Sequence, residues 1–156
     1  MDLPSLRNET RYGMPAADQI LFNRHYVLGY SYYFRQAKWA LEIIDPEDTG
    51  LERSDNFRTD YRIPKIFRAD LEDYAKSGHD RGHLVASANQ RGDELQNSET
   101  FLLSNMSPQK PKFNRRVWKL LEEEVRRLNN TEKILETDVI AGPICHFDKP
   151  VEYIGD

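Results

Sequence analysis

The chain has 156 residues, of which 38% are hydrophobic and 31% are charged. This length favours one domain, residues 1–156, and this composition excludes an intrinsically disordered chain. The sequence has no apolar run of about 18 residues, so we expect no membrane partner, and its single cysteine excludes an internal disulfide bond. The formal net charge of −4 differs from the basic charge that many nucleic-acid binders carry.

The first 24 residues are expected to form an extended arm with a turn at Gly13–Pro15. The segment Met1–Arg7 lacks the apolar core of a signal peptide. We therefore expect either that the protein stays in the compartment where it is made or that a leader for export, the periplasm or the mitochondrion has been removed.

Two apolar segments then predict a β-hairpin. Residues 26–32 indicate one strand, and residues 38–44 indicate its partner, with Trp39, Leu41 and Ile43 on one face. A loop rich in turn formers follows at residues 45–50. Residues 51–79 predict a polar loop with a short helix near residues 68–76.

The second half of the chain predicts two further strands and a long helix. Residues 100–106 and 138–144 indicate short apolar strands, and Asn114 precedes a helix of about 15 residues. Apolar side chains recur in this helix at spacings of three and four, at Val117, Leu121, Val125 and Leu128, with Trp118 alongside. Strands dominate and helices are few, so the fold class is α+β with a mainly antiparallel sheet.

The segment Asp80–His83 and the later Asn114 carry residue types that suit metal-assisted phosphodiester hydrolysis. A histidine can take a proton from water near neutral pH, and an arginine can bind phosphate oxygens in a bidentate manner. The amide oxygen of Asn114 suits Mg²⁺, which prefers oxygen ligands and keeps several waters. Glu122 lies two helical turns further on, where it could orient a water on the metal.

A basic window surrounds this helix start. Residues 108–127 hold seven basic and three acidic side chains, a local charge of +4 that can bind a phosphate backbone. Lys110, Arg115 and Arg116 are the candidate substrate-binding residues. The alternative is an ordinary solvated helix face.

Each of these residues also has a structural interpretation. Asp80 suits a turn, Asn114 suits a helix N-cap, and a single histidine such as His83 is more often structural than catalytic. His79 and His83 have the spacing of a zinc pair on a helix, but the glycines beside them disfavour a helix and no third ligand is evident. From the residues alone, the support for a phosphodiesterase is weak.

Taken together and in order, the motifs closely resemble the DNA/RNA non-specific endonucleases, a family that includes Serratia-type nucleases and endonuclease G. The close resemblance rests on Asp80–Ala86, Glu99–Gln109 and Phe113–Glu122, and a looser one on Arg11–Pro15, Arg53–Asp60 and Val139–Ile144. Most of the chain is thus covered. The resemblance implies a ββα-metal (His-Me finger) core with the long helix after the metal-ligand asparagine.

The resemblance also implies roles for individual residues. His83 would be the general base that activates water, Asn114 the one direct protein ligand of Mg²⁺ (with Mn²⁺ as a substitute), and Glu122 the residue that holds metal-bound water. Arg53, preferred to Arg58, would stabilise the phosphate and its transition state. Two further roles are that Arg81 contacts phosphate or holds its loop, and that Asn105 orients His83.

The family usually continues past the strand at Gly142–Pro143 with further strands, and this chain stops at Asp156. We therefore expect an open sheet edge that pairs with a second chain, or a homodimer. The predicted function is a Mg²⁺-dependent endonuclease that hydrolyses DNA and RNA in one step. The alternative is a catalytically weak module that binds nucleic acid or an inhibitor on the same scaffold, and a zinc-stabilised structural protein is a distant third.

Overall fold

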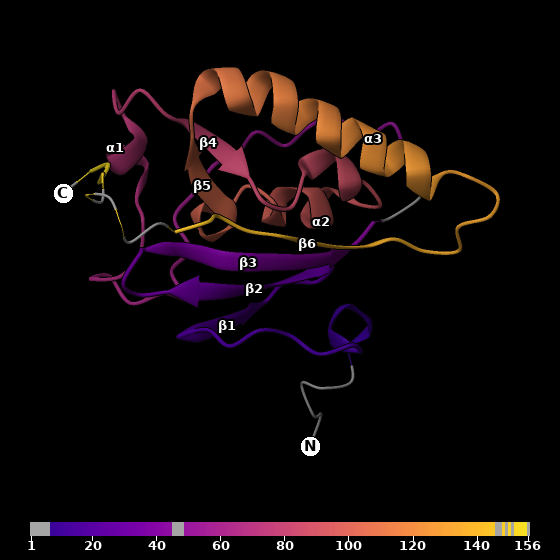
Figure 1. Cartoon of the computed structure of the whole chain (residues 1–156), viewed down its shortest axis with the longest axis horizontal. Helices are drawn as coiled ribbons and strands as arrows, with labels where there is room; N and C mark the ends of the chain where they lie inside the picture. The colour runs from indigo at the N-terminus through magenta and orange to yellow at the C-terminus, as the bar shows by residue number, and fades with distance from the viewer. Residues whose placement is uncertain (1–6, 45–48, 146–147, 149, 151, 156) are drawn as a thin grey trace.

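A four-stranded antiparallel sheet forms the base of the molecule (Figure 1). The computed structural model describes residues 7–44, 49–145, 148, 150 and 152–155. The strands are β1 (Gln19–Phe22), β2 (Tyr26–Ser31), β3 (Gln36–Ile43) and β6 (Asp138–Ala141), in the order β1-β2-β3-β6. The predicted hairpin and the last predicted strand are confirmed. Part of the predicted loop at residues 45–50 lies outside the described residues.

The N-terminal arm is more structured than the sequence suggested. It contains a 3₁₀ turn, η2 (Asn8–Thr10), and the edge strand β1, whose backbone pairs with β2 from Gln19↔Tyr30 to Phe22↔Val27. No alternation of polar and apolar residues marks β1 in the sequence, so pairing with β2 rather than local pattern explains it.

The two faces of the sheet bury different residues. Trp39 and Leu41 lie with Val27 on one face, as predicted, while Ile43 of the same row is only half-buried. Trp39 lies over Gly29, where an added Cβ would collide with the indole ring. The opposite face carries the larger core, formed by Leu21, Tyr26, Leu28, Tyr30, Ala37, Ala40, Ile63, Leu84 and Val85.

A second, two-stranded sheet lies on this larger core (Figure 1). β4 (Asp80–His83) pairs antiparallel with β5 (Met106–Gln109), from Asp80↔Gln109 to His83↔Met106. A Cβ at Gly82 would collide with the side chain of Gln109, which explains the glycine of the Asp80–His83 motif. The pairing of β4 with β5 therefore sets the position of His83 at the end of β4.

The strand predicted at residues 100–106 is wrong for most of its length. β5 begins only at Met106, and the residues before it form a turn and the 3₁₀ helix η4 (Leu103–Asn105). Side chains bond the backbone here: Thr100 Oγ1 donates to Asn97 O at 2.7 Å, and Asn105 Nδ2 donates to Thr100 O at 2.9 Å. Such local bonds compete with a strand ladder.

The helices lie on the same side of the main sheet as the β4–β5 pair (Figure 1). α1 (Leu71–Tyr74) matches the predicted short helix, and α2 (Glu94–Glu99) follows the 3₁₀ turn η3 (Ser87–Asn89). The long helix begins with a π-helical segment, η5 (Phe113–Trp118), and continues as α3 (Lys119–Asn129). Asn114 lies inside this helix, with its backbone N bonded to Lys110 O, so the N-cap interpretation is wrong.

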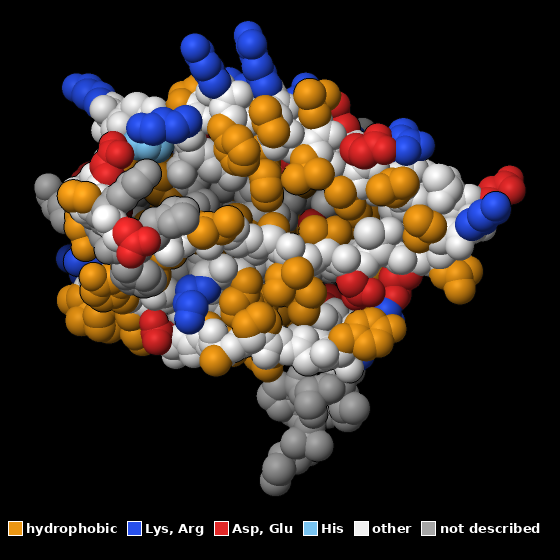
Figure 2. Space-filling model, in the orientation of Figure 1, with side chains coloured by type: hydrophobic (Ala, Val, Ile, Leu, Met, Phe, Trp, Pro, Cys, Tyr) orange, Lys and Arg blue, Asp and Glu red, His pale blue; other side chains and the backbone are white. Residues whose placement is uncertain are grey.

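The long helix presents its polar side to the protein and its apolar side to solvent. The side chains of this helix that are half-buried or buried are mostly polar: Asn114, Trp118, Glu122, Val125, Arg126 and Asn129. Val117, Leu120, Leu121 and Leu128 are between 42% and 63% exposed. Figure 2 shows hydrophobic side chains gathered over the region between α3 and β6. The amphipathic pattern thus predicts the helix, but of its predicted apolar stripe only Val125, with the neighbouring Trp118, is half-buried.

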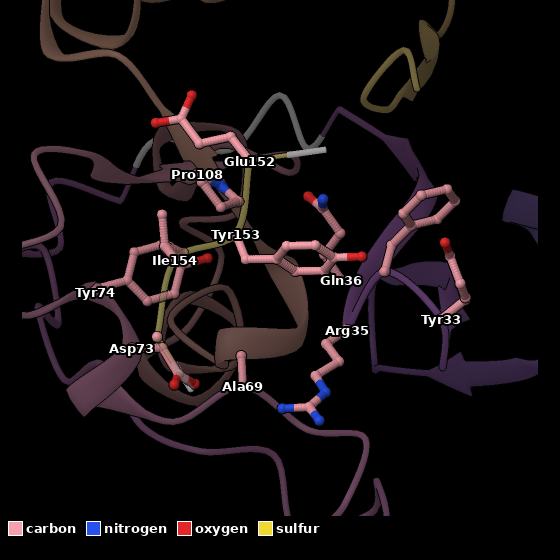
Figure 3. Close-up of a pocket in the computed structure, with 12 residues that line it drawn as sticks. Tyr33, Arg35, Gln36, Ala69, Asp73, Tyr74, Pro108, Glu152, Tyr153 and Ile154 are labelled. Atoms are coloured by element: carbon pink, nitrogen blue, oxygen red, sulfur yellow. The ribbon is translucent and has the colours of Figure 1, made fainter. Parts of the chain in front are cut away.

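Residues 152–155 lie against α1 and β5. Ile154 packs on the cluster of Tyr74, Leu103 and Met106. Together with Tyr153 it lines a cavity of about 380 Å³ that also includes Gln36 and Tyr74 (Figure 3). Across the described part of the chain, no helix is long and apolar enough to cross a membrane.

Candidate active site

Most of the predicted site residues meet in one groove between the hairpin and the long helix. Two adjoining hollows of about 400 and 420 Å³ share Arg53, Arg81, Asn114 and Arg115 in their linings, and we call them together the groove. The second hollow also reaches His83 at the end of β4 and the inner side of α3. Its further lining residues include His83, Ser87, Lys119, Glu122 and Arg126.

His83 lies at the end of β4, half-buried in the groove. The rings of Phe57 and Phe101 contact its imidazole edge-on, with centroids 5.7 and 5.0 Å away. Its Nε2 has no hydrogen-bond partner among the described residues. Burial, followed by the positive charges of Arg53 and Arg81, lowers the pKa of His83 to about 3. The ring is therefore neutral at pH 7 and can accept a proton.

Arg53 and Arg81 approach His83 from two segments and rest on the same aromatic rings. The Arg53 guanidinium lies 5.0 Å from the Phe101 ring centre, and the Arg81 guanidinium lies 4.0 Å from the Phe57 ring centre. Cation–π contacts hold a guanidinium by its face and leave its N–H edge for an anion. The segment that carries Arg53 is fixed nearby by backbone bonds between Arg58 and Phe101 and between Leu103 and Arg58.

Asn114 is oriented by a carboxylate. Its Nδ2 donates to Asp80 Oδ2 at 3.0 Å, and Arg115 donates to both oxygens of Asp80 at 2.8 Å. The Arg115 hydrogen bonds hold the pKa of Asp80 below its usual value. With its nitrogen bound to Asp80, the amide presents its oxygen as the free end. The Asn114 oxygen could therefore hold a hard cation, which prefers oxygen ligands.

Glu122 lies on α3, in the same hollow as His83 and Asn114. Burial raises the pKa of Glu122 to about 7, against the opposing effect of Arg126. A cation in the groove would favour the ionised carboxylate. Among the described residues, no three His, Cys, Asp or Glu side chains gather into a metal site. The donor set thus suits a weakly held hard cation rather than zinc.

Three predicted residues lie elsewhere. Asn105 does not bond the His83 ring; its side chain bonds both N and O of Val85, two residues after the histidine. Lys110 pairs with Glu152 at 3.8 Å and lines a different hollow, and Arg116 is not among the residues that line the groove. Arg115 does line it, but its guanidinium is already bound to Asp80.

Sequence reasoning missed three contributors. Asp80, first interpreted as a turn residue, orients Asn114 across 34 positions of sequence. Trp118 Nε1 donates to His83 O at 3.0 Å and so ties the helix to the end of β4. Arg126 lines the groove. The helical spacing of Asn114, Trp118, Glu122 and Arg126, at every fourth residue, is the signal that could have found the last two.

The chain is similar to known nucleases in sequence and in fold. The sequence model of the DNA/RNA non-specific endonuclease family matches residues 4–156. The chain is 38% identical to human mitochondrial endonuclease G over 86% of its length, and 37% identical to the mitochondrial nuclease of Saccharomyces cerevisiae over the same share. A nuclease from a Nostoc species is 35% identical over 85% of the chain.

A solved structure of the EndoG/EndoGI complex, described as showing the mechanism of EndoG inhibition, aligns with a TM-score of 0.80 and 37% identity over 86% of this chain. The alignment covers 57% of the chain in that solved structure. The three relatives above are covered over 46%, 42% and 48% of their lengths, so the chain spans about half the length of the curated relatives it matches.

Proposed function

The chain belongs to the DNA/RNA non-specific endonuclease family, and on this premise we propose that it is an endonuclease that hydrolyses phosphodiester bonds of DNA and RNA. One observation carries the proposal: a neutral histidine, two arginines, an oriented asparagine oxygen and a carboxylate line a single groove. These are His83, Arg53, Arg81, Asn114 and Glu122.

His83 would take the proton from the attacking water as the general base. The phosphate bound beside it would bring negative charge next to Arg53 and Arg81, whose charges depress the pKa of the ring. Partial neutralisation of these arginines raises the basicity of His83 when substrate is bound. The same two guanidiniums would stabilise the charge that grows on the phosphate oxygens.

We propose Mg²⁺, with Mn²⁺ as a substitute, as the cofactor of this groove. The Asn114 oxygen would be the direct protein ligand, since its amide nitrogen is bound to Asp80, and Glu122 would complete the site at longer range. When bound, the cation would stabilise the negative charge on the departing oxygen, so that no strong side-chain acid is needed.

Recognition is proposed to involve mainly the phosphate backbone. The groove carries four arginines and Lys119 beside the carboxylates Asp80 and Glu122. The basic side chains suit phosphate oxygens, and phosphate contacts carry little sequence information. The expected substrates are therefore both DNA and RNA. Incubation of end-labelled DNA and RNA strands with Mg²⁺ tests this: a ladder of internal products from both supports it, and intact strands with a folded protein contradict it.

A second proposal concerns a polypeptide partner. β6 is an edge strand of the main sheet, and Ile140 on it is 56% exposed. Hydrophobic side chains gather on the surface between β6 and α3 (Figure 2). Edge strands and apolar surfaces of this kind pair with further chain. We propose that a second copy of this chain, or a separate chain that adds strands, covers this surface.

The alternative function is a catalytically weak module that binds nucleic acid or an inhibitor. A binding module would need the groove arginines, but it would not need a base beside an oriented metal ligand. Binding of DNA that survives His83→Ala, together with no cleavage by the parent in Mg²⁺, would favour this alternative.

A further inference from the structure

Five buried polar side chains lie directly behind the groove and form one hydrogen-bonded network. None is more than 4% exposed. They come from β3, the end of η3 and α2, and of these elements η3 lines the groove through Ser87. We call them the amide network: Glu42, Asn89, Gln90, Gln96 and Asn97.

Glu42 is the centre of this network. Its two carboxylate oxygens accept from Asn89 Nδ2 at 2.7 Å and from Gln90 Nε2 at 2.8 Å. The oxygen of each amide must therefore face away from the carboxylate. Gln90 Oε1 accepts from Gln96 Nε2 at 2.7 Å, and Asn89 Oδ1 turns toward α3. A buried carboxylate lowers the stability of the fold, so a gain in stability does not explain the presence of Glu42. The orientation that Glu42 imposes on the two amides explains it better.

One end of the network holds a groove arginine on α3. Arg126 Nη1 donates to Asn89 Oδ1 at 2.9 Å, and Arg126 lines the hollow that contains His83 and Glu122. The orientation of the Asn89 amide is fixed by Glu42. Glu42 thus determines, through the Asn89 amide, where the Arg126 guanidinium on α3 can lie.

The other end holds the segment of Arg53. Asn97 Oδ1 accepts from the backbone N of Ser54 at 3.0 Å, and its Nδ2 donates to Ser87 O at 2.8 Å and to Gln90 O at 3.1 Å. Ser54 adjoins Arg53, and Ser87 lines the groove. Asn97 therefore connects the coil that carries Arg53 to the network.

We propose that the amide network is a positioning device that holds Arg126 and the segment carrying Arg53 in the groove. A guanidinium binds phosphate in a bidentate manner only when its plane is held, and arginine is otherwise a mobile side chain. Phosphate binding by these arginines belongs to the proposed function, on which the binding test rests. Glu42 and Asn97 are positioning residues and touch no substrate.

The test is a double-mutant cycle on DNA binding at pH 8 in EDTA, measured by fluorescence anisotropy with a short labelled duplex. Glu42→Gln keeps the shape of the side chain but places an amide donor against Asn89 or Gln90. We expect it to weaken binding about tenfold in the parent and less than twofold when Arg126→Ala is already present. Equal losses in both backgrounds would mean a general structural effect and would overturn the proposal.

The Arg53 end is tested in the same way. Asn97→Ala should weaken binding in the parent but add little to Arg53→Ala, and independent effects would overturn this half of the inference. Ser107→Ala, a largely buried hydroxyl bonded to Gln36 outside the network, is the matched control and should leave binding unchanged. If Glu42→Gln does not fold, Asn89→Ser replaces it, because it removes the acceptor of Arg126 and keeps the bond of Gln90 to Glu42.

A crystal structure of Glu42→Gln separates this inference from the proposed function. The expected result is that Arg126 leaves Asn89 Oδ1 and that the groove wall shifts. A retained bond with an unchanged groove would overturn the inference, whether or not the parent binds DNA. A parent that neither binds nor cleaves nucleic acid, while the variant still displaces Arg126, would instead refute the proposed function alone.

Discussion

At the scale of single residues, the site depends on side chains that orient other side chains. His83 was evident in the sequence because its motif is specific, but Asp80 and Glu42 act through contacts that span 34 and 47 positions. Such contacts leave no local pattern in a sequence. The predicted set therefore contained the groups that would touch substrate and missed the groups that hold them.

Asp80 provides the first prediction. Asp80→Ala removes the acceptor of Asn114 Nδ2 and frees Arg115, so the amide of Asn114 loses its fixed orientation. We expect affinity for Mn²⁺ to fall by about 10–100-fold, as for other groups that orient a metal ligand. Titration followed by electron paramagnetic resonance measures this. Unchanged affinity in a folded variant would contradict the role of Asp80.

Arg53 provides the second prediction. Arg53→Ala should lower kcat/KM on DNA by about 10²-fold or more, because it removes a guanidinium beside the phosphate. Arg127→Ala makes the same change of charge at an exposed position on α3 that pairs with Glu124. It should change kcat/KM by less than threefold at moderate salt. Equal losses in the two variants would indicate only a general effect of charge.

The third prediction concerns pH. Burial raises the pKa of Glu42 to about 7 against its ordinary 4.5, with Gln90 and Asn89 lowering it, Glu122 raising it and Arg126 lowering it. Because the folded state binds this proton more tightly than the unfolded state, the Glu42 contribution to the free energy of unfolding increases as pH falls from about 7 to 4.5.

We expect this contribution to be on the order of 2 kcal/mol in EDTA, and Glu42→Gln to lack it. Urea unfolding of parent and variant at pH 8 and pH 5 isolates this contribution, because both proteins share the effects of the other shifted groups. These are Glu122, whose raised pKa acts in the same direction, and His83, whose lowered pKa destabilises the folded state below pH 6.5. Parallel pH profiles would contradict the account.

At the scale of elements, patterns predicted which segments form strands and helices better than they predicted which side each element buries. The hairpin β2–β3 and the long helix follow from alternation and from helical spacing. The inner face of the long helix is polar because it carries Asn114, Glu122 and Arg126 toward the groove. A rule that buries the apolar face of a helix therefore fails where the lining of a polar groove lies on the inner face.

The apolar stripe of α3 yields the fourth prediction. If a second copy covers the stripe and the edge of β6, Leu120→Glu should shift the chain from dimer to monomer in sedimentation velocity. Ile66→Glu changes a similarly exposed apolar residue outside this surface, and as the control it should leave the dimer intact. A monomeric parent would exclude the homodimer and leave a separate chain as the proposed partner.

At the scale of the whole molecule, the family and the α+β fold were predictable because three ordered motifs fix the hairpin and the helix relative to each other. The prediction of one domain over residues 1–156 stays a prediction. The N-terminal strand and the turn before β5 were not predictable, because tertiary pairing and buried side-chain bonds decide them.

The central claim is that the groove cleaves nucleic acid with His83 as its base. The most direct measurement is nicking of supercoiled plasmid by the purified chain in Mg²⁺ and in EDTA, beside His83→Ala and the control His25→Ala. We predict that the parent and His25→Ala nick the plasmid in Mg²⁺, and that no protein nicks it in EDTA. The nicking rate of His83→Ala should be lower by at least about 10²-fold. Equal nicking by His83→Ala, or none by a folded parent in Mg²⁺, would contradict the account.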